Sequence, residues 1–322
     1  MSLPALLRDN LALPVIGAPL FIVSHPELTL AQCKAGVVGA FPALNARPAA
    51  QLEEWLAHIT AELARYKAEN PGAKVAPLAV NQIIHPSNDR LGHDLAMCEK
   101  HRVPLVITSL SAPNEVVPRV HGYGGLVYHD VISVRHARKA AEAGVDGLIL
   151  VCAGAGGHAG MLSPFALVSE VRRFFEGTII LSGAITRGEH VLAAQAMGAD
   201  LAYIGTRFIA TTEARASEEY KRMIVESAAA DIVYSDLFSG VRGNYLRGSI
   251  VASGLDPDDL PAGDKSTMKF GSGGSSKAKA WRDIWGAGQG VGSIDRVAST
   301  REVVEDLRRE YEAARARLSL TS

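Results

Sequence analysis

The chain has 322 residues, of which 48% are hydrophobic and 21% charged, and a formal net charge of −1, so it can bury a sizeable core. The near-neutral charge, without a long run of Lys or Arg, argues against binding to nucleic acid or to an anionic membrane surface. No stretch approaches about 18 uninterrupted apolar residues, and the N-terminus lacks the apolar core of a signal peptide. We therefore expect a cytoplasmic protein without a membrane span.

From the start of the chain to about residue 210, short apolar runs alternate with amphipathic segments. The apolar runs have the length and composition of buried strands, and the other segments place apolar residues at helical spacing. The predicted strands are 13–16, 37–41, 75–80, 105–107, 126–128, 148–151, 178–181 and 201–204. The predicted helices are 28–34, 49–66, 89–101, 114–120, 134–143, 164–175 and 189–197.

This alternation of eight strands with helices is typical of an α/β fold, and indicates a (β/α)8 TIM barrel. Gly144, Gly177 and Gly198 each stand just ahead of a predicted strand, where a glycine commonly ends the preceding helix. A doubly wound parallel sheet is the alternative, because counting strands does not show whether the sheet closes.

The alternation ends after the eighth strand. Residues 213–229 are predicted as a helix and 232–251 as short helices, whereas 256–293 form a glycine-rich segment that we interpret as a flap over a site. A charged segment, 300–318, predicts a helix that folds back on the barrel. The predicted organisation is a barrel core over 1–210, a smaller, partly helical lid over 211–298, and a C-terminal helix over 299–322.

The most distinctive stretch is residues 144–160, GVDGLILVCAGAGGHAG. A short apolar run is followed by a loop of glycines and alanines, against whose backbone a flat ligand can lie. Apart from the thiol of Cys152, His158 is the only titratable group of this loop, and an imidazole can give or take a proton near neutral pH. We predict that this loop forms one wall of a ligand site, with His158 as the catalytic residue. The alternative is that His158 is an ordinary surface histidine.

The loops after the predicted seventh and eighth strands carry Ser182-Gly183 and Gly205-Thr206. In a barrel, ligands bind at the C-terminal ends of the strands, and phosphate often binds at these two loops. Free backbone N–H groups near a helix N-terminus favour an anion. The pair therefore predicts a phosphate site, and two ordinary turns are the alternative.

Three further polar residues stand at predicted strand ends. Asn81 could hydrogen-bond a polar ring edge or cap a turn, and His129 with Asp130 could face the substrate or form a structural pair. No lysine lies in or at the end of a predicted strand, which argues against a Schiff-base enzyme, and we expect no metal site. With neither a lysine nucleophile nor a metal expected, we predict that an organic cofactor carries out the reaction. FMN combines the phosphate and the flat ring that the predicted site would hold.

The segment AGGHAG, residues 155–160, resembles the AGGHxG motif of the nitronate monooxygenase family, formerly called 2-nitropropane dioxygenases. Residues 181–185 and 204–208 are similar to its two phosphate segments, residues 14–19 to its opening strand, and residues 287–289, ending in Gln289, to a late motif. The matches span most of the chain in order and spacing.

The resemblance implies an FMN-bearing TIM barrel with a lid, in which His158 faces the substrate. It implies the transfer of one electron from an alkyl nitronate, such as propionate 3-nitronate, through the flavin to O2, giving a carbonyl compound and nitrite. Gln289 is a candidate for substrate contact through the lid. The implied cofactor-binding residues are Gly17, Ala18, Pro19, Asn81, His129, Gly157, Ser182, Gly183, Gly205 and Thr206.

The chain also departs from this family. Some relatives carry a lysine directly after the histidine that matches His129, where this chain has Asp130, so a positive charge near the flavin is unassigned. Similar barrels act as NAD(P)H:quinone reductases or enoyl reductases, so NAD(P)H and a quinone are alternative partners to O2 and a nitronate. A non-redox isomerase or lyase with a phosphorylated ligand is a further alternative, and a homodimer is one option for the assembly.

Overall fold

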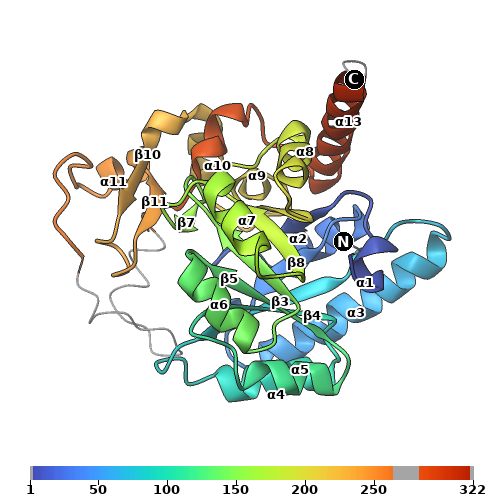
Figure 1. Cartoon of the computed structure of the whole chain (residues 1–322). Helices are drawn as coiled ribbons and strands as arrows, with labels where there is room; N and C mark the ends of the chain where they lie inside the picture. Colours follow the sequence, from blue (N-terminus) through green and yellow to red (C-terminus); the bar gives the residue numbers. More distant parts are fainter. Residues whose placement is uncertain (1–2, 264–282, 320–322) are drawn as a thin grey trace.

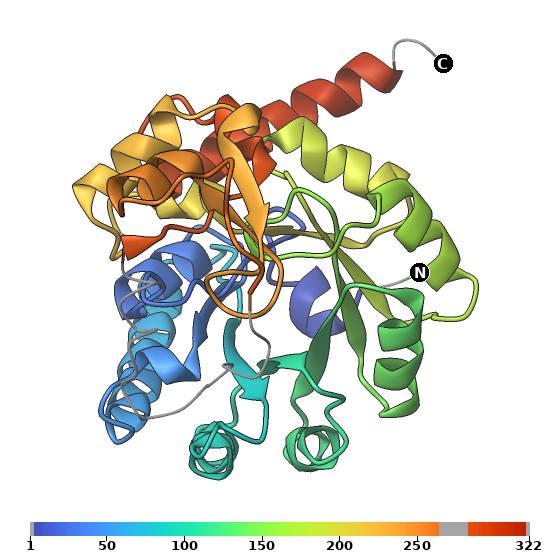
Figure 2. The ribbon, with the colours of Figure 1, turned by 90° about the vertical axis from the view of Figure 1, so that its left-hand side faces the viewer.

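The computed structural model describes residues 3–263 and 283–319, and its centre is a barrel of eight parallel strands (Figures 1 and 2). The strand order is β1-β9-β8-β6-β5-β4-β3-β2. The barrel closes where Val38 N donates to Val15 O (3.1 Å) and Gly17 N donates to Val38 O (2.8 Å). This closure confirms the TIM barrel and excludes the doubly wound sheet. The strands are β1 (Val15–Gly17), β2 (Gly39–Pro42), β3 (Leu78–Ile84), β4 (Leu105–Leu110), β5 (Leu126–Val131), β6 (Gly147–Val151), β8 (Thr178–Ser182) and β9 (Leu201–Ile204).

A ring of helices surrounds the barrel and buries the outward faces of the strands (Figure 2). Gly144 and Gly198 have positive φ at the ends of α6 and α8, as expected of glycines that stop a helix. The helices of the ring are α2 (Pro26–Lys34), α3 (Gln51–Glu69), α4 (Leu91–Lys100), α5 (Val116–Gly122), α6 (Val134–Glu142), α7 (Pro164–Arg172), α8 (Gly188–Ala196) and α13 (Thr300–Ser319).

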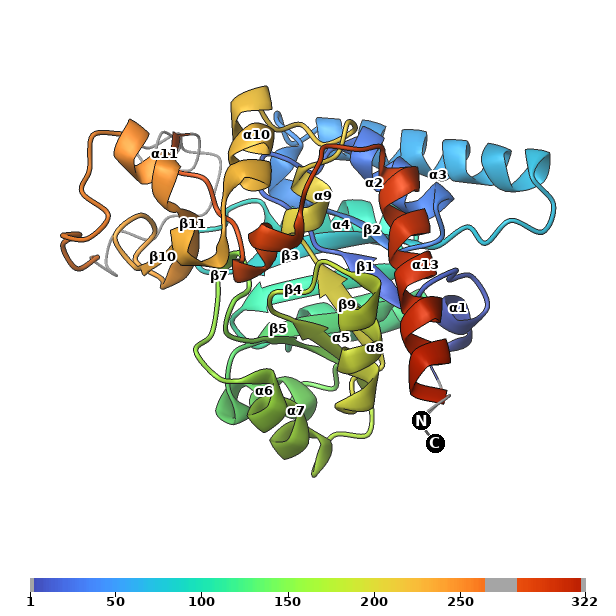
Figure 3. The same cartoon turned by 90° about the horizontal axis from the view of Figure 1, so that it is seen from above.

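The C-terminal helix α13 completes this ring. It packs against α8 and α2, at the place of the eighth barrel helix (Figure 3). The contact with α8 is close: a Cβ added to Gly188 would lie 2.1 Å from the carbonyl oxygen of Leu307. The lid is therefore an insertion between the eighth strand and the eighth helix.

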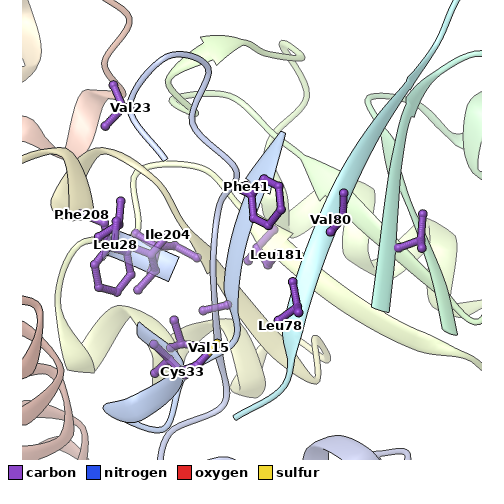
Figure 4. Close-up of a cluster of buried hydrophobic side chains, with 14 of the residues drawn as sticks. Val15, Val23, Leu28, Cys33, Phe41, Leu78, Val80, Leu181, Ile204 and Phe208 are labelled. Atoms are coloured by element: carbon purple, nitrogen blue, oxygen red, sulfur yellow. The ribbon is translucent and has the colours of Figure 1, made fainter. Parts of the chain in front are cut away.

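Alternation along each strand divides the core into two layers. Outward side chains such as Val15, Phe41 and Val80 pack against the helices (Figure 4), whereas inward side chains fill the barrel together with Leu7 of α1 (Ala5–Arg8), which covers its N-terminal end. Period-two alternation assigns each strand residue to one layer, and this rule places the polar residues of the site.

The inserted lid follows α9 (Thr206–Ile209) and lies on the side of the barrel opposite the N-terminus (Figure 1). It contains α10 (Glu218–Glu226), β10 (Ile232–Ser235), β11 (Gly243–Leu246) and α11 (Arg247–Ala252). The prediction of short helices over 232–251 is wrong for most of that segment. Strand β11 pairs antiparallel with β10 and with β7 (Gly157–His158), a partner some 85 residues earlier that local sequence does not reveal.

The predicted glycine-rich flap lies only partly within the described residues. Its last part forms η4 (Gln289–Ser293), which packs against α9 and α10, whereas residues 264–282 lie outside the described residues. None of the described helices combines the length and apolarity needed to cross a membrane.

Candidate active site

A cavity of about 470 Å³ lies at the C-terminal ends of the barrel strands, beneath the lid. Its size falls in the range of small-molecule and cofactor sites, and its position is that of the active site in TIM-barrel enzymes. Barrel strands supply the floor, the glycine loop supplies one wall, and α10 with the segment before η4 supplies another.

The floor is the last layer of inward-facing side chains. Asn81 follows inward Ala79 by two residues on β3, Ser109 follows Ile107 on β4, and Asp130 follows Tyr128 on β5. These three form one hydrogen-bonded row, in which Asn81 Nδ2 donates to Ser109 Oγ (3.0 Å) and the Ser109 hydroxyl donates to Asp130 Oδ2 (2.7 Å). The barrel thus gathers three polar groups on adjacent strands.

His129 and Asp130 face opposite sides of the sheet. His129 is 3% exposed and outside the cavity, with its Nδ1 2.8 Å from the hydroxyl oxygen of Thr108. Burial lowers the pKa of His129 to about 4, so the ring is neutral near pH 7. The structure therefore makes Asp130 the residue of this pair that faces the ligand cavity, and His129 a residue of the outer core.

Two buried polar atoms at the floor have no hydrogen-bond partner among the described residues, namely Oδ1 of Asp130 and the hydroxyl of Tyr203 on β9. Burial raises the pKa of Asp130 to about 7, against a smaller opposing effect of the Ser109 hydrogen bond. Burial also raises the pKa of Tyr203 well above its usual value, with a further contribution from the charge of Asp130. Unpartnered buried polar groups are costly, and both line the cavity, so a bound ligand can satisfy them.

His158 lies on β7 and lines the same cavity. Its Nε2 lies 2.8 Å from the hydroxyl oxygen of Ser239, and that hydroxyl donates to the carbonyl of Val241 (2.9 Å). The Ser239 oxygen therefore accepts from Nε2–H, which leaves the imidazole lone pair on Nδ1. Burial lowers the pKa of His158 to about 4, so the ring is a neutral base near pH 7.

The glycine loop packs against the lid more tightly than the sequence suggests. A Cβ added to Gly156 would lie 2.8 Å from Gly288 N, so protein backbone already occupies one side of the loop. Gln289 N donates to Gly154 O (2.9 Å) and Asn244 Nδ2 donates to Ala155 O (2.6 Å). The glycines thus allow close approach of the lid, while Gly157, with open space around its Cβ position, remains accessible.

The two predicted anion loops differ from each other. The amides of Gly183 and Gly205 donate to no acceptor within the described chain, and both residues line the cavity. Helix α9 begins immediately after Gly205, as expected. The first amide of α8, in contrast, already has a partner within the chain, because Gly188 N donates to Glu310 Oε2 of α13 (2.8 Å).

The rim of the cavity includes left-handed backbone at residues other than glycine. Ile22 has φ 58° and Leu110 has φ 81°, conformations that cost about 1–3 kcal/mol each and often occur at functional sites. Buried Asn45 holds the first of these: its Oδ1 accepts from Ile22 N (2.9 Å), and its Nδ2 donates to Leu20 O and Ser24 O. The strained rim is therefore held in place by a specific side chain.

The structure brings most of the predicted site residues together at one cavity, but not all. Gly17, His129 and Gln289 do not line it; a Cβ on Gly17 would meet the Gln32 side chain at 2.2 Å, so this glycine serves packing. The predicted residues that line the cavity are Ala18, Pro19, Asn81, Gly157, His158, Ser182, Gly183, Gly205 and Thr206.

Sequence reasoning missed several cavity residues. Ser109 and Tyr203 each stand two residues after an inward apolar side chain, Ile107 and Leu201, so strand alternation could have found them. Ser239 and Tyr220 come from the lid; the latter stacks on Trp285 with ring centroids 4.9 Å apart. No local pattern signals these two.

Comparison with known proteins agrees with this geometry. The family model for nitronate monooxygenase matches residues 10–310. The chain belongs to the nitronate monooxygenase family. A nitronate monooxygenase of Paraburkholderia phytofirmans is 27% identical, over 92% of each chain. Enzymes of this family are flavin-dependent oxidoreductases, so this family member is an oxidoreductase.

Two solved structures share the fold. Nitroalkane oxidase from Streptomyces ansochromogenes superimposes with a TM-score of 0.78 at 24% identity, covering 97% of this chain and 99% of that one. FabK from Thermotoga maritima gives a TM-score of 0.77 at 23% identity, covering 98% and 97%. Both likenesses concern the whole chain, lid included.

Proposed function

We propose that this nitronate monooxygenase family member uses FMN to oxidise alkyl nitronates, such as propionate 3-nitronate, with O2, giving a carbonyl compound and nitrite. The observation that carries the proposal is the shared cavity. The neutral base His158 faces the same space as the amides of Gly183 and Gly205, which have no acceptor in the described part of the chain. A phosphorylated cofactor and a small substrate can therefore meet there.

The residues present fit FMN. The amides of Gly183 and Gly205, the Ser182 side chain and the Thr206 hydroxyl supply donors for a phosphate at β8 and β9. Across the floor, the row Asn81–Ser109–Asp130 offers hydrogen-bonding groups to the polar part of a ring system. FMN, when bound, supplies the electron-accepting chemistry that no side chain of this cavity provides.

The chain's own groups would act on the substrate. Because Ser239 accepts from Nε2–H, the lone pair of the neutral His158 ring is on Nδ1. As a neutral imidazole that lines the cavity, His158 can take a proton from a nitroalkane or orient the nitronate that lacks it. Trp285, Tyr220 and the rim residue Ile22 surround the cavity with apolar surface, which limits water near the reacting atoms.

The test begins with the visible spectrum of the purified protein and the identity of any flavin released on denaturation. Anaerobic mixing with propionate 3-nitronate should bleach the flavin, and nitrite should form when O2 is admitted. Bleaching by NADPH but not by the nitronate would replace the proposal with a quinone or enoyl reductase. A colourless protein that takes up no FMN would favour a non-redox isomerase or lyase.

A further inference from the structure

The floor of the cavity holds a buried carboxyl group, Asp130, that has no counter-ion in the part of the chain that the structure describes. Asp130 Oδ2 accepts from Ser109 (2.7 Å), whereas its Oδ1 is buried and has no partner among the described residues. The hydroxyl of Tyr203, on the opposite part of the barrel wall, is also buried without a partner. Both line the cavity, so a ligand that fills it places polar atoms against this pair.

Among the described residues, no cationic side chain forms an ion pair with Asp130. Besides Tyr203 of β9, the charged or titratable side chains that line the described cavity with Asp130 are Arg47 after η1 (Ala43–Asn45), His136 of α6, His158 of β7 and Tyr220 of α10. Arg47 instead donates to Leu44 O and lies over the Phe21 ring. Burial raises the pKa of Asp130, and the Ser109 hydrogen bond lowers it by a smaller amount. Burial therefore disfavours the charged carboxylate, and binding of a proton removes that charge.

The position of Asp130 places this group beside the proposed cofactor. The anion-binding amides lie at the ends of β8 and β9, and Asp130 lies at the end of β5, separated from β8 in the barrel by β6 alone. Asn81, Ser109 and Asp130 supply polar groups on the floor. They would therefore hold the ring of a cofactor whose phosphate bound at β8 and β9.

We propose that Asp130 is a proton-holding residue of the site, which takes up a proton from solvent when the bound flavin is reduced. This inference rests on the proposed function. Two electrons from a chemical reductant, with one proton, would leave one negative charge on the flavin. That charge favours formation of an O–H bond at the Asp130 carboxylate, so two protons enter for two electrons. Proton uptake thus replaces a fixed cation.

The midpoint potential of the FMN-loaded protein, measured from pH 6 to 9, tests this stoichiometry. For a two-electron couple, one proton gives about 30 mV per pH unit and two protons about 59 mV. Between pH 7.5 and 8.5 we expect about 59 mV per unit for the wild type and about 30 mV for Asp130→Asn. The same substitution at exposed Asp259 should leave the wild-type slope.

Ser109→Ala gives a second, directional test. The Ser109 hydrogen bond lowers the pKa of Asp130, so its removal should shift the steep region of the potential to higher pH. A ¹³C spectrum of the ligand-free, Asp-labelled chain should contain one carboxyl that titrates near pH 7 and is absent from Asp130→Asn. A spectrum in which every Asp titrates near 4 would overturn the inference.

The outcomes separate this inference from the proposed function. Equal slopes in the wild type and Asp130→Asn, with FMN bound to both, would overturn the role of Asp130 and leave the nitronate reaction standing. A chain that takes up no FMN at all would overturn both.

Discussion

His129 offers a test of which face of β5 the ligand meets. Its ring is 3% exposed in the outer core, and burial lowers its pKa to about 4, whereas an unfolded chain has a histidine pKa of about 6.5. As the pH falls below 6.5, the unfolded chain binds a proton that the folded chain refuses. The stability that the neutral His129 ring contributes is therefore fully present above pH 6.5. This contribution is lost progressively as the pH falls from 6.5 to about 4.

The size of this loss follows from the two pKa values. At pH 5 a shift from 6.5 to about 4 costs about 2 kcal/mol of folding free energy. His158, whose pKa is also about 4, contributes a loss of the same direction. The difference in this loss between the wild type and a chain without His129 isolates the contribution of His129, because the other titrating groups are common to both.

The measurement is urea unfolding of His129→Gln at pH 7 and pH 5. We expect the variant to lose about 2 kcal/mol less than the wild type over this interval, while His58→Gln, on the exposed face of α3, behaves as the wild type. Because His129 lies outside the cavity, FMN uptake should persist. Identical pH dependence in His129→Gln and the wild type, or loss of FMN from the variant, would refute this placement.

Three further predictions concern the base, its support and the helix ring. His158→Ala should lower nitrite release well over tenfold with FMN still bound, because general acid–base groups contribute about 100-fold or more; unchanged turnover would remove His158 from the reaction. Ser239→Ala removes one neutral hydrogen bond (2.8 Å), worth about 0.5–1.5 kcal/mol, so kcat/KM should fall roughly 2–12-fold, and Ser239→Thr should restore it. Gly188→Ala would place a Cβ 2.1 Å from Leu307 O and should lower stability by about 1–3 kcal/mol, measured by thermal unfolding. Gly92→Ala in α4, with no heavy atom within 4 Å, is the matched control, and an equal effect of both substitutions would contradict close packing of α13 on α8.

Much of the barrel could be read from the sequence because each βα unit is locally specified. The apolar run at 148–151 became β6 (Gly147–Val151), and the following segment from Pro164 became α7. Strand periodicity also predicts which way the floor residues point. Ser109 stands two residues after inward Ile107, and Asp130 two residues after inward Tyr128, so both point inward. The family resemblance alone implied that His129 binds the cofactor. Counting the alternation along β5 would have shown that His129 faces away from the cavity.

The sequence by itself determined the order of strands and helices, the glycine loop with His158, and the family. Tertiary structure alone decided that the barrel closes at Val38, that α13 packs between α8 and α2 as the eighth barrel helix, and that Ser239 supports His158 from the lid. It also buried Asp130 away from every cationic side chain among residues 3–263 and 283–319. The physical reason is range: strands and helices follow from neighbouring residues, whereas closure, the β7–β11 pairing and the burial of a carboxyl depend on contacts between distant segments.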